Sequence, residues 1–338
     1  MAHDTPTVLV TGGAGYIGSH VVVQLVEAGH KVVVYDNLST GFPWAVLGGE
    51  LVVGDLADRP ALSALFRKHR FRSVLHFAAH IIVPESVEKP LKYYGNNTRN
   101  TLGLLETCAE FGVENFVFSS TAAVYGIPET MPIAEDAPLK PINPYGASKM
   151  MSERMLVDMA AVSPMRYVIL RYFNVAGADE AGRIGQATAE ATHLIKVACQ
   201  AAAGLRPALT IFGTDYPTPD GTCIRDYVHV VDLARAHLDA LAYLDKGGAS
   251  AILNCGYERG TSVKEIVDVV RKITGVPFTV TVGARRPGDP PELVAANGRI
   301  RATLGWKPRH DDLERLVASA WRWEQKLAEK QRRAAAGS

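Results

Sequence analysis

Residues 5–36 read TPTVLVTGGAGYIGSHVVVQLVEAGHKVVVYD, and they contain a complete strand-helix-strand pattern. An apolar strand leads into the glycine turn TGGAGYIG, a helix with an apolar stripe follows, and a second apolar strand ends at Asp36. This arrangement is typical of dinucleotide-binding domains, in which the N-terminus of the helix attracts a pyrophosphate. Working outward from it, we predict an α/β fold with a Rossmann-type, doubly wound parallel sheet and a smaller C-terminal α/β substrate domain.

Three glycines and one acid give this unit its predicted chemistry. Gly12 and Gly15 lack a Cβ, so the turn can be tight and its backbone can approach a pyrophosphate, while Gly18 lets the helix lie against the strand. A carboxylate at Asp36 can accept both ribose hydroxyls of an adenosine and would repel a 2′-phosphate, so we predict NAD rather than NADP. A glycine-rich turn without a ligand is the alternative. We favour a turn that binds a dinucleotide, because the strand, the helix and the terminal acid all stand at the expected spacing.

Length, charge and cysteine content limit the other functional classes. A chain of 338 residues predicts an NAD-binding domain over 1–177 and a mainly substrate-binding domain over 178–338, with some chain crossing between them. The 36 basic and 35 acidic residues argue against binding to nucleic acid or a membrane surface. No apolar run reaches the roughly 20 residues of a spanning helix. The four cysteines are far apart and lack metal-ligand spacing, so we expect a cytoplasmic protein without a metal.

Several polar residues follow or interrupt the later predicted strands. Asp55 follows a strand and could bind the adenine amine, or could cap a helix that opens at Ala57. His76 lies within an apolar strand and is expected to be a hydrogen-bonded core residue rather than a catalyst. A long helix over 91–111 carries Asn96 and Asn97 near its start, which could face the cofactor cleft or water. A further helix is expected over 187–204.

Thr121, Tyr145 and Lys149 form the candidate catalytic group. Thr121 ends a predicted strand, where open parallel sheets bind ligands. Asn143, followed by proline, is a good N-cap for the next helix, which places Tyr145 and Lys149 one turn apart on the same face. A tyrosine has an unperturbed pKa of about 10, so a pKa near 7 requires about 4 kcal/mol of differential stabilisation of the phenolate. We expect the Lys149 ammonium and an oxidised nicotinamide to supply it.

Five motifs in the chain are similar to those of the UDP-glucose 4-epimerases, within the extended short-chain dehydrogenase/reductase family. The resemblance covers nearly the whole chain and includes the substrate half. The motifs are TGGAGYIGSH at 11–20, SSTAAVYG at 119–126, YGASK at 145–149, LRYFN at 170–174 and CIRDYVH at 223–229, joined by FGTDYP at 212–217 and RRPGD at 285–289.

The resemblance implies a role for each matching residue and an NAD cofactor. It implies that Tyr145 is the base, Lys149 its activator and a ligand of the nicotinamide ribose, and Thr121 the hydroxyl that shares the substrate proton. It implies further NAD contacts from Tyr16, Ile17, Asp36, Asn37, Asp55, Leu56, Phe77, Ala78, Ala79, Asn96 and Phe173. For the UDP-sugar it implies Asn174, His193, Leu194, Ile211, Phe212, Arg225, Arg286 and Asp289, with Thr121, Tyr145 and Leu293 at the sugar.

The chain departs from this family pattern at three positions. Ile81 stands where some members have a lysine near the nicotinamide, and His193 replaces an asparagine. Leu293 replaces a tyrosine that limits sugar size in some members, so N-acetylated sugars are an alternative substrate.

Arginines suit a diphosphate because their donors are fixed and planar. Arg285, beside Arg286, could be only a solvated charge.

The reaction implied by this resemblance is reversible, NAD-dependent 4-epimerisation of UDP-glucose and UDP-galactose through a transient 4-keto sugar. UDP-pentoses and UDP-uronic acids are further alternatives. A nucleotide-sugar 4,6-dehydratase would need an acid and a base where Ala122 and Ala123 stand. A non-catalytic dinucleotide sensor would not need Thr121, Tyr145 and Lys149 together. The family also implies a homodimer, formed through the helices near Asn97 and Met151.

Overall fold

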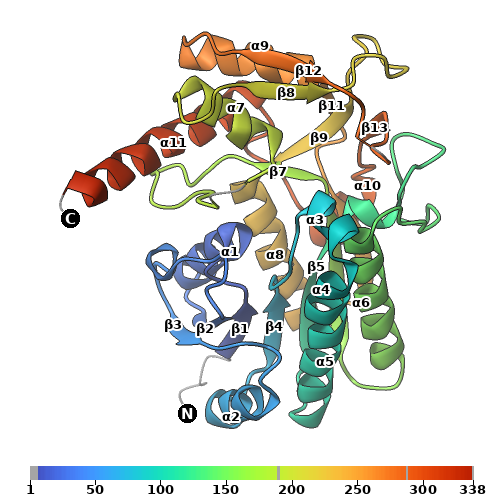
Figure 1. Cartoon of the computed structure of the whole chain (residues 1–338). Helices are drawn as coiled ribbons and strands as arrows, with labels where there is room; N and C mark the ends of the chain where they lie inside the picture. Colours follow the sequence, from blue (N-terminus) through green and yellow to red (C-terminus); the bar gives the residue numbers. More distant parts are fainter. Residues whose placement is uncertain (1–6, 189–190, 287, 337–338) are drawn as a thin grey trace.

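The central element is a seven-stranded sheet, seen in a computed structural model that describes residues 7–188, 191–286 and 288–336 (Figure 1). Its strand order is β10-β6-β5-β4-β1-β2-β3, and all neighbouring strands are parallel. The bounds are β1 Thr7–Thr11, β2 Lys31–Asp36, β3 Glu50–Val53, β4 Ser73–His76, β5 Asn115–Thr121, β6 Arg166–Tyr172 and β10 Ala251–Cys255. The strand order reverses between β1 and β4, where doubly wound sheets bind ligands. The predicted Rossmann-type fold is confirmed.

Alternate side chains of β1 enter two different apolar cores, one on each face of the sheet. Val8 and Val10 pack with α1 and α8, whereas Leu9 packs with α2, α5 and α6. This period of two, with both faces apolar, is what a parallel strand covered by helices on both sides requires. The bounds of these helices are α1 Tyr16–Glu27, α2 Arg59–His69, α5 Asn100–Glu110, α6 Pro144–Ala161 and α8 Val230–Asp245.

The second part of the chain lies beyond one end of the large sheet (Figure 1). Its strand β9 pairs with β7, β11 and β13, and a separate parallel pair joins β8 to β12. Because β7 begins two residues after β6 ends, this part is connected to the large sheet at the carboxyl end of β6. The bounds are β7 Asn174–Ala176, β8 Leu209–Phe212, β9 Ile224–His229, β11 Gly260–Ser262, β12 Val280–Gly283, β13 Glu292–Leu293, α7 Leu194–Ala202, α9 Val263–Thr274 and α11 Leu313–Ala336. Helix α10 (Gly298–Leu304) packs instead on β10 and α8, with Ile300 in the core of the large sheet.

Two predicted helices differ from the observed ones. The helix expected over 91–111 consists of α4 (Pro90–Tyr93), a π-helical turn (Tyr94–Arg99) and α5; a shorter helix, α3 (Val83–Glu88), precedes α4. A helix expected over 187–204 begins only at α7, and residues 189–190 of that range lie outside the described residues. The chain also crosses back, since β10 and α8 come from the second half and join the first sheet and its helical cover. The two-domain division with crossing remains a prediction.

We predict that Gly18→Ala destabilises the protein and weakens NAD binding. A Cβ on Gly18 would collide with the Gly12 carbonyl oxygen and lie 2.8 Å from the Gly13 Cα. Overpacking of this kind lowers the free energy of unfolding by about 1–3 kcal/mol. Gly298→Ala is the matched control, because nothing lies within 4 Å of the added Cβ. Denaturant unfolding and NAD titration calorimetry measure both effects, and equal behaviour of the two variants would contradict the packing role of Gly18.

Candidate active site

The glycine turn joins β1 to α1 directly beside the segment that follows β4. Gly12 has a φ of 71°, and a Cβ on it would lie 2.5 Å from the Ala78 backbone nitrogen. Helix α1 follows Gly15 without a side-chain cap, so no side chain satisfies its first N–H groups. This close, uncapped turn fits the pyrophosphate of a dinucleotide. It brings together the predicted residues Gly12, Gly15, Tyr16, Ile17 and Gly18.

Asp36 lies at the carboxyl end of β2, against the glycine turn. Its two carboxylate oxygens accept hydrogen bonds from the backbone N–H groups of Ala14 (2.9 Å) and Leu38 (2.8 Å). The next residue, Asn37, donates its side-chain amide to the Asp55 carboxylate at 2.8 Å. The three residues predicted to contact the adenosine end of NAD therefore form one polar group, with the buried Leu56 beside it.

Asp55 does not cap the helix that follows it. Helix α2 begins at Arg59, and its N-cap is Asp58, whose side chain accepts from the Ala61 N–H at 3.1 Å. Asp55 accepts instead from the Ala57 N–H at 2.8 Å. This hydrogen bond and the Asn37 amide lower the pKa of the Asp55 carboxyl. The N-cap alternative is therefore wrong, because the helix starts later than Ala57.

Asn97 ties the segment after β4 to helix α6. Its side-chain amide accepts from the His80 N–H (2.8 Å), donates to the His80 carbonyl (2.9 Å) and donates to Ser148 (3.1 Å). Asn96 donates to the Asn97 amide oxygen at 3.0 Å. Both asparagines lie in the π-helical turn, a distortion often found at functional sites. Asn97 thereby fixes the backbone next to the predicted cofactor residues Phe77, Ala78 and Ala79. Of the two alternatives for Asn97, exposure to water is wrong, because the side chain is buried in this network.

His76 is a core residue, as expected. Its ring nitrogens hydrogen-bond with Thr11 (2.6 Å) and Thr101 (2.8 Å), and burial lowers its pKa to about 3. Both nitrogens already have partners, which leaves none for a substrate.

Thr121, Tyr145 and Lys149 lie together at the junction of β5 and α6. Asn143 caps α6 as predicted, accepting from the Gly146 N–H at 2.8 Å, and the helix begins at Pro144. Thr121, the last residue of β5, acts on the Tyr145 hydroxyl and lowers the pKa of the phenol. Lys149 is 3% exposed, and its ammonium stands 4.4 Å from the centre of the Phe118 ring. The predicted catalytic group is thus assembled in space.

Burial shifts the pKa values of Tyr145 and Lys149. It raises the pKa of Tyr145, and Thr121 only partly opposes the effect. It also lowers the pKa of Lys149 to about 7, with the Glu153 carboxylate acting in the opposite direction. In the protein alone, desolvation of the phenol dominates its pKa. That Lys149 and an oxidised nicotinamide together favour the phenolate stays a prediction.

The strands of the second part bring predicted substrate residues together. Asn174 opens β7 and stands opposite Tyr227 of β9, while Leu293 of β13 stands opposite Arg225 of β9. Arg225 forms a short ion pair with Asp289. These contacts gather Asn174, Arg225, Asp289 and Leu293 around one strand.

The other predicted substrate residues lie on β8, on α7 and in the loop before β13. Ile211 is buried in β8, and the Arg286 guanidinium lies 4.0 Å from the centre of the Phe212 ring. His193 precedes the first residue of α7, Leu194, and its Nδ1 is 2.8 Å from the Gln186 amide. Pro287 of the quoted motif lies outside the described residues.

Arg285 is more than a solvated charge. Its guanidinium bonds the Asp215 carboxylate at 2.7 Å and lies 4.3 Å from the centre of the buried Tyr216 ring. It therefore links the segment before β13 to Asp215 and Tyr216, in the loop that leads into β9.

Phe173 links the predicted cofactor and substrate residues. It is buried in an apolar cluster with Ala122, next to Thr121, and Leu293 packs against the same cluster. Ile81, by contrast, is half exposed.

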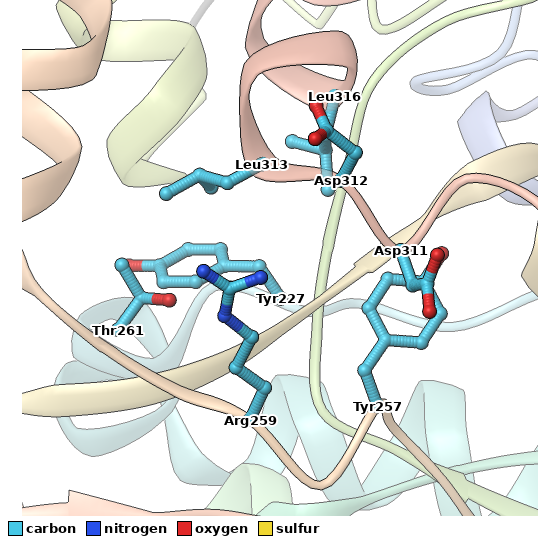
Figure 2. Close-up of a pocket in the computed structure, with 8 residues that line it drawn as sticks. All are labelled: Tyr227, Tyr257, Arg259, Thr261, Asp311, Asp312, Leu313 and Leu316. Carbon is cyan, nitrogen blue, oxygen red and sulfur yellow. The ribbon is translucent and has the colours of Figure 1, made fainter.

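Two small hollows lie outside the Tyr145 group. Figure 2 shows one, where Arg259 and Tyr227 face the start of α11 near Leu313. The other is lined by Gly177, His193 and the buried Lys196–Glu324 ion pair, so it borders only the α7 end of the predicted substrate residues. Within the part of the chain that the structure describes, no cluster of His, Cys, Asp or Glu could hold a metal ion.

Comparison with known proteins gives the family. Residues 8–256 match the NAD dependent epimerase/dehydratase family. The UDP-glucose 4-epimerase of Azospirillum brasilense is 59% identical over 324 residues, which cover 96% of this chain and 93% of that protein.

Solved structures agree in fold over nearly the whole chain. The UDP-glucose-4-epimerase from Stenotrophomonas maltophila with bound NAD and formylated UDP-arabinopyranose is 39% identical, with a TM-score of 0.92, over 96% of this chain and 99% of that one. The UDP-Glc/GlcNAc 4-epimerase from Campylobacter jejuni is 48% identical, with a TM-score of 0.84, over 95% of this chain and 99% of that one. The chain therefore belongs to the NAD dependent epimerase/dehydratase family, and within it to the UDP-glucose 4-epimerases.

Proposed function

We propose that the protein catalyses the reversible 4-epimerisation of UDP-glucose and UDP-galactose, with NAD as its cofactor. The observation that carries this proposal is the assembly of Thr121, Tyr145 and Lys149 at the carboxyl end of β5, on the sheet edge that also carries the glycine turn. The curated and structural relatives that cover nearly the whole chain support the same reaction.

The predicted cofactor residues fit NAD. The close turn at Gly12, the uncapped start of α1 and the carboxylate of Asp36 supply a seat for the pyrophosphate and the adenosine ribose. Bound NAD supplies a reversible hydride acceptor and, when oxidised, a positive charge. The residues assigned to it are Gly12, Gly15, Tyr16, Ile17, Gly18, Asp36, Asn37, Asp55, Leu56, Phe77, Ala78, Ala79, Asn96, Lys149 and Phe173.

Tyr145 is assigned as the group that removes the proton of the sugar 4-hydroxyl and returns it after the sugar has turned. Thr121, which acts on the Tyr145 hydroxyl, is assigned to hold the substrate oxygen in line with the phenol. Because burial raises the pKa of Tyr145, the phenolate needs positive charge beside it. Lys149 supplies such a charge only while it is protonated, and its pKa of about 7 makes that condition sensitive to pH.

Arg225 and Arg286 are assigned to the diphosphate of the substrate. Guanidinium groups offer fixed planar donors to phosphate oxygens. The Arg225–Asp289 ion pair and the contact of Arg286 with Phe212 hold these side chains in defined positions. The residues assigned to the UDP-sugar are Thr121, Tyr145, Asn174, His193, Leu194, Ile211, Phe212, Arg225, Arg286, Asp289 and Leu293.

Leu293 favours one second candidate substrate, a UDP-N-acetylhexosamine. Leucine is smaller than tyrosine, and this side chain packs beside Phe173 where the sugar is expected. The Campylobacter jejuni relative acts on both UDP-Glc and GlcNAc forms, according to its name. The 4,6-dehydratase alternative is disfavoured, because Ala122 is buried in an apolar cluster and offers no acid or base.

We also propose a homodimer and a cytoplasmic location. Exposed apolar side chains gather on mutually packed helices, namely Val87 on α3, Leu91 on α4, Leu102 on α5 and Met151 on α6, and a second copy would cover them. Sedimentation velocity distinguishes the dimer from a monomer. The four cysteines are buried free thiols, which suits a reducing compartment. Across the described residues, no helix has the length and apolar character needed to cross a bilayer.

Replacing Tyr145 by Phe should leave NAD and UDP binding nearly intact while the turnover of UDP-galactose falls by about 10²–10⁴-fold, the usual contribution of a general base. Calorimetry measures binding and proton NMR measures turnover. Tyr243→Phe, in α8, is the control and should keep wild-type turnover. Loss of NAD binding in Tyr145→Phe, or full turnover, would argue against the assignment.

Replacing Leu293 by Tyr should restrict the sugar pocket. We expect turnover of UDP-N-acetylgalactosamine to fall by about 10–200-fold relative to that of UDP-galactose, the usual range for discrimination by size. Competition kinetics with both substrates measure the ratio, and Leu293→Met is the control of similar volume. An unchanged ratio of the two turnover rates in Leu293→Tyr would show that Leu293 does not limit the size of the sugar.

A further inference from the structure

Glu153 lies on α6 one turn beyond Lys149, and it is buried with a full set of hydrogen-bond donors. Its Oε1 accepts a short hydrogen bond from the Ser120 hydroxyl and a second from the Arg171 Nε at 3.0 Å. Its Oε2 accepts from the second terminal nitrogen of Arg171 at 2.6 Å. Both side chains of this ion pair are 3% exposed.

This one carboxylate joins the elements that carry the candidate catalytic group. Ser120 directly precedes Thr121 on β5, and Arg171 of β6 stands opposite Ser120 in the strand register. Glu153 shares α6 with Tyr145 and Lys149. Any shift of α6 along the sheet would have to break the Ser120 and Arg171 bonds, which are buried and therefore costly to leave unpaired.

The pair is itself supported from the outer side. Arg171 also donates to the Tyr125 hydroxyl (3.0 Å) and to the Glu135 backbone carbonyl (3.0 Å). The Tyr125 hydroxyl donates to Asn254 of β10 at 2.7 Å. Arg171 therefore has a fixed position that does not depend on Glu153 alone.

Lys149 has no direct ionic partner among the described residues: no carboxylate oxygen lies within ion-pair distance of its ammonium. The Phe118 ring lies against it on one side, and ring faces attract cations. Glu153 is the carboxylate whose charge acts on Lys149, and it favours the protonated form. A buried ammonium needs such support to remain charged.

We propose that Glu153 is a positioning residue of this active site, which holds α6 in register with β5 through Ser120 and Arg171 and so places Tyr145 and Lys149 against Thr121. This inference rests on the proposed function, because it assigns a role toward the reaction that Tyr145 and Lys149 perform.

The surroundings of Lys149 define what else can act on its charge. Two groups lie on its own helix, and the others come from the elements packed around it. The titratable and charged groups are Tyr145 and Glu153 on α6, His76 on β4, Arg171 and Tyr172 on β6, and Tyr93 on α4. His76 has a pKa lowered to about 3 by burial and stays neutral near pH 7, and burial raises the pKa values of the tyrosines. Glu153 is therefore the negative charge in this set, and Arg171 moderates it.

The test is the pH dependence of kcat in Glu153→Gln. Removing the carboxylate charge should lower the pKa of Lys149, so the fall of kcat at alkaline pH should move to lower pH by about half a unit or more. We expect kcat at the optimum to fall by about 10–100-fold, with KM for UDP-galactose nearly unchanged. Glu153→Asp keeps the charge, so the pH at which kcat falls on the alkaline side (the alkaline limb) should return to its wild-type value, even where kcat stays low.

Glu135→Gln is the matched control. It removes a buried carboxylate that bonds the Asn254 N–H on the far side of Arg171, so the alkaline limb should stay at its wild-type position. If Glu153→Gln does not fold, Ser120→Ala provides the second test. Without the Ser120 hydroxyl, less of the Glu153 charge is neutralised by hydrogen bonding, so this charge acts more strongly on Lys149. The fall of kcat at alkaline pH should then move to higher pH. A wild-type limb in a folded Glu153→Gln, or in Ser120→Ala, would overturn the proposal. Wild-type turnover of UDP-galactose tests the proposed function separately.

Discussion

Burial of the Lys149 ammonium at the junction of β5 and α6 is the constraint on which the candidate site depends. The depression of its pKa from 10.5 to about 7 corresponds to a cost on the order of 5 kcal/mol for the charged form. The Phe118 ring and the Glu153 carboxylate both reduce that cost. The same burial raises the pKa of Tyr145, so the protein alone keeps the phenol neutral. Near pH 7 the protonated and neutral forms of Lys149 are then present in similar amounts. Positive charge from a bound oxidised cofactor would then have a large effect on the phenol, which couples acid–base chemistry to cofactor occupancy.

The parallel sheet explains why the reacting groups meet. The carboxyl ends of β1, β2, β4 and β5 share one edge, which carries Gly12, Asp36, Ala78 and Thr121. Asn97 fixes the loop after β4 against α6, and so links the cofactor side of the edge to Tyr145. The second part of the chain grows from the same edge through β7. Of the two arginines assigned to the diphosphate, Arg225 is held by Asp289 and Arg286 lies against the Phe212 ring, which suits firm binding of a diphosphate and looser contact with the sugar.

The sequence predicted the features whose causes are local. The glycine turn, the acid at the end of β2 and the Asn143 cap depend on neighbouring residues, and each lies where it was expected. Features that depend on distant partners could not be read in the same way. The junction of β10 with β6 and the Glu153–Arg171 pair join residues far apart in the chain. The burial that raises the pKa of Tyr145 also could not be read from the sequence, because it depends on how deeply the folded protein encloses the phenol. Family resemblance supplied the substrate residues, which the residue pattern alone left open.

The most direct measurement is proton NMR of UDP-galactose incubated with the purified protein and no added nucleotide. We expect UDP-glucose to appear, because a site that returns its hydride to the sugar regenerates NAD in every cycle and needs no second substrate. Added NAD restores turnover if the purified protein has lost its cofactor. A spectrum of UDP-galactose that stays unchanged after NAD has been added would contradict the hexose 4-epimerase and direct attention to a UDP-pentose or UDP-uronic acid.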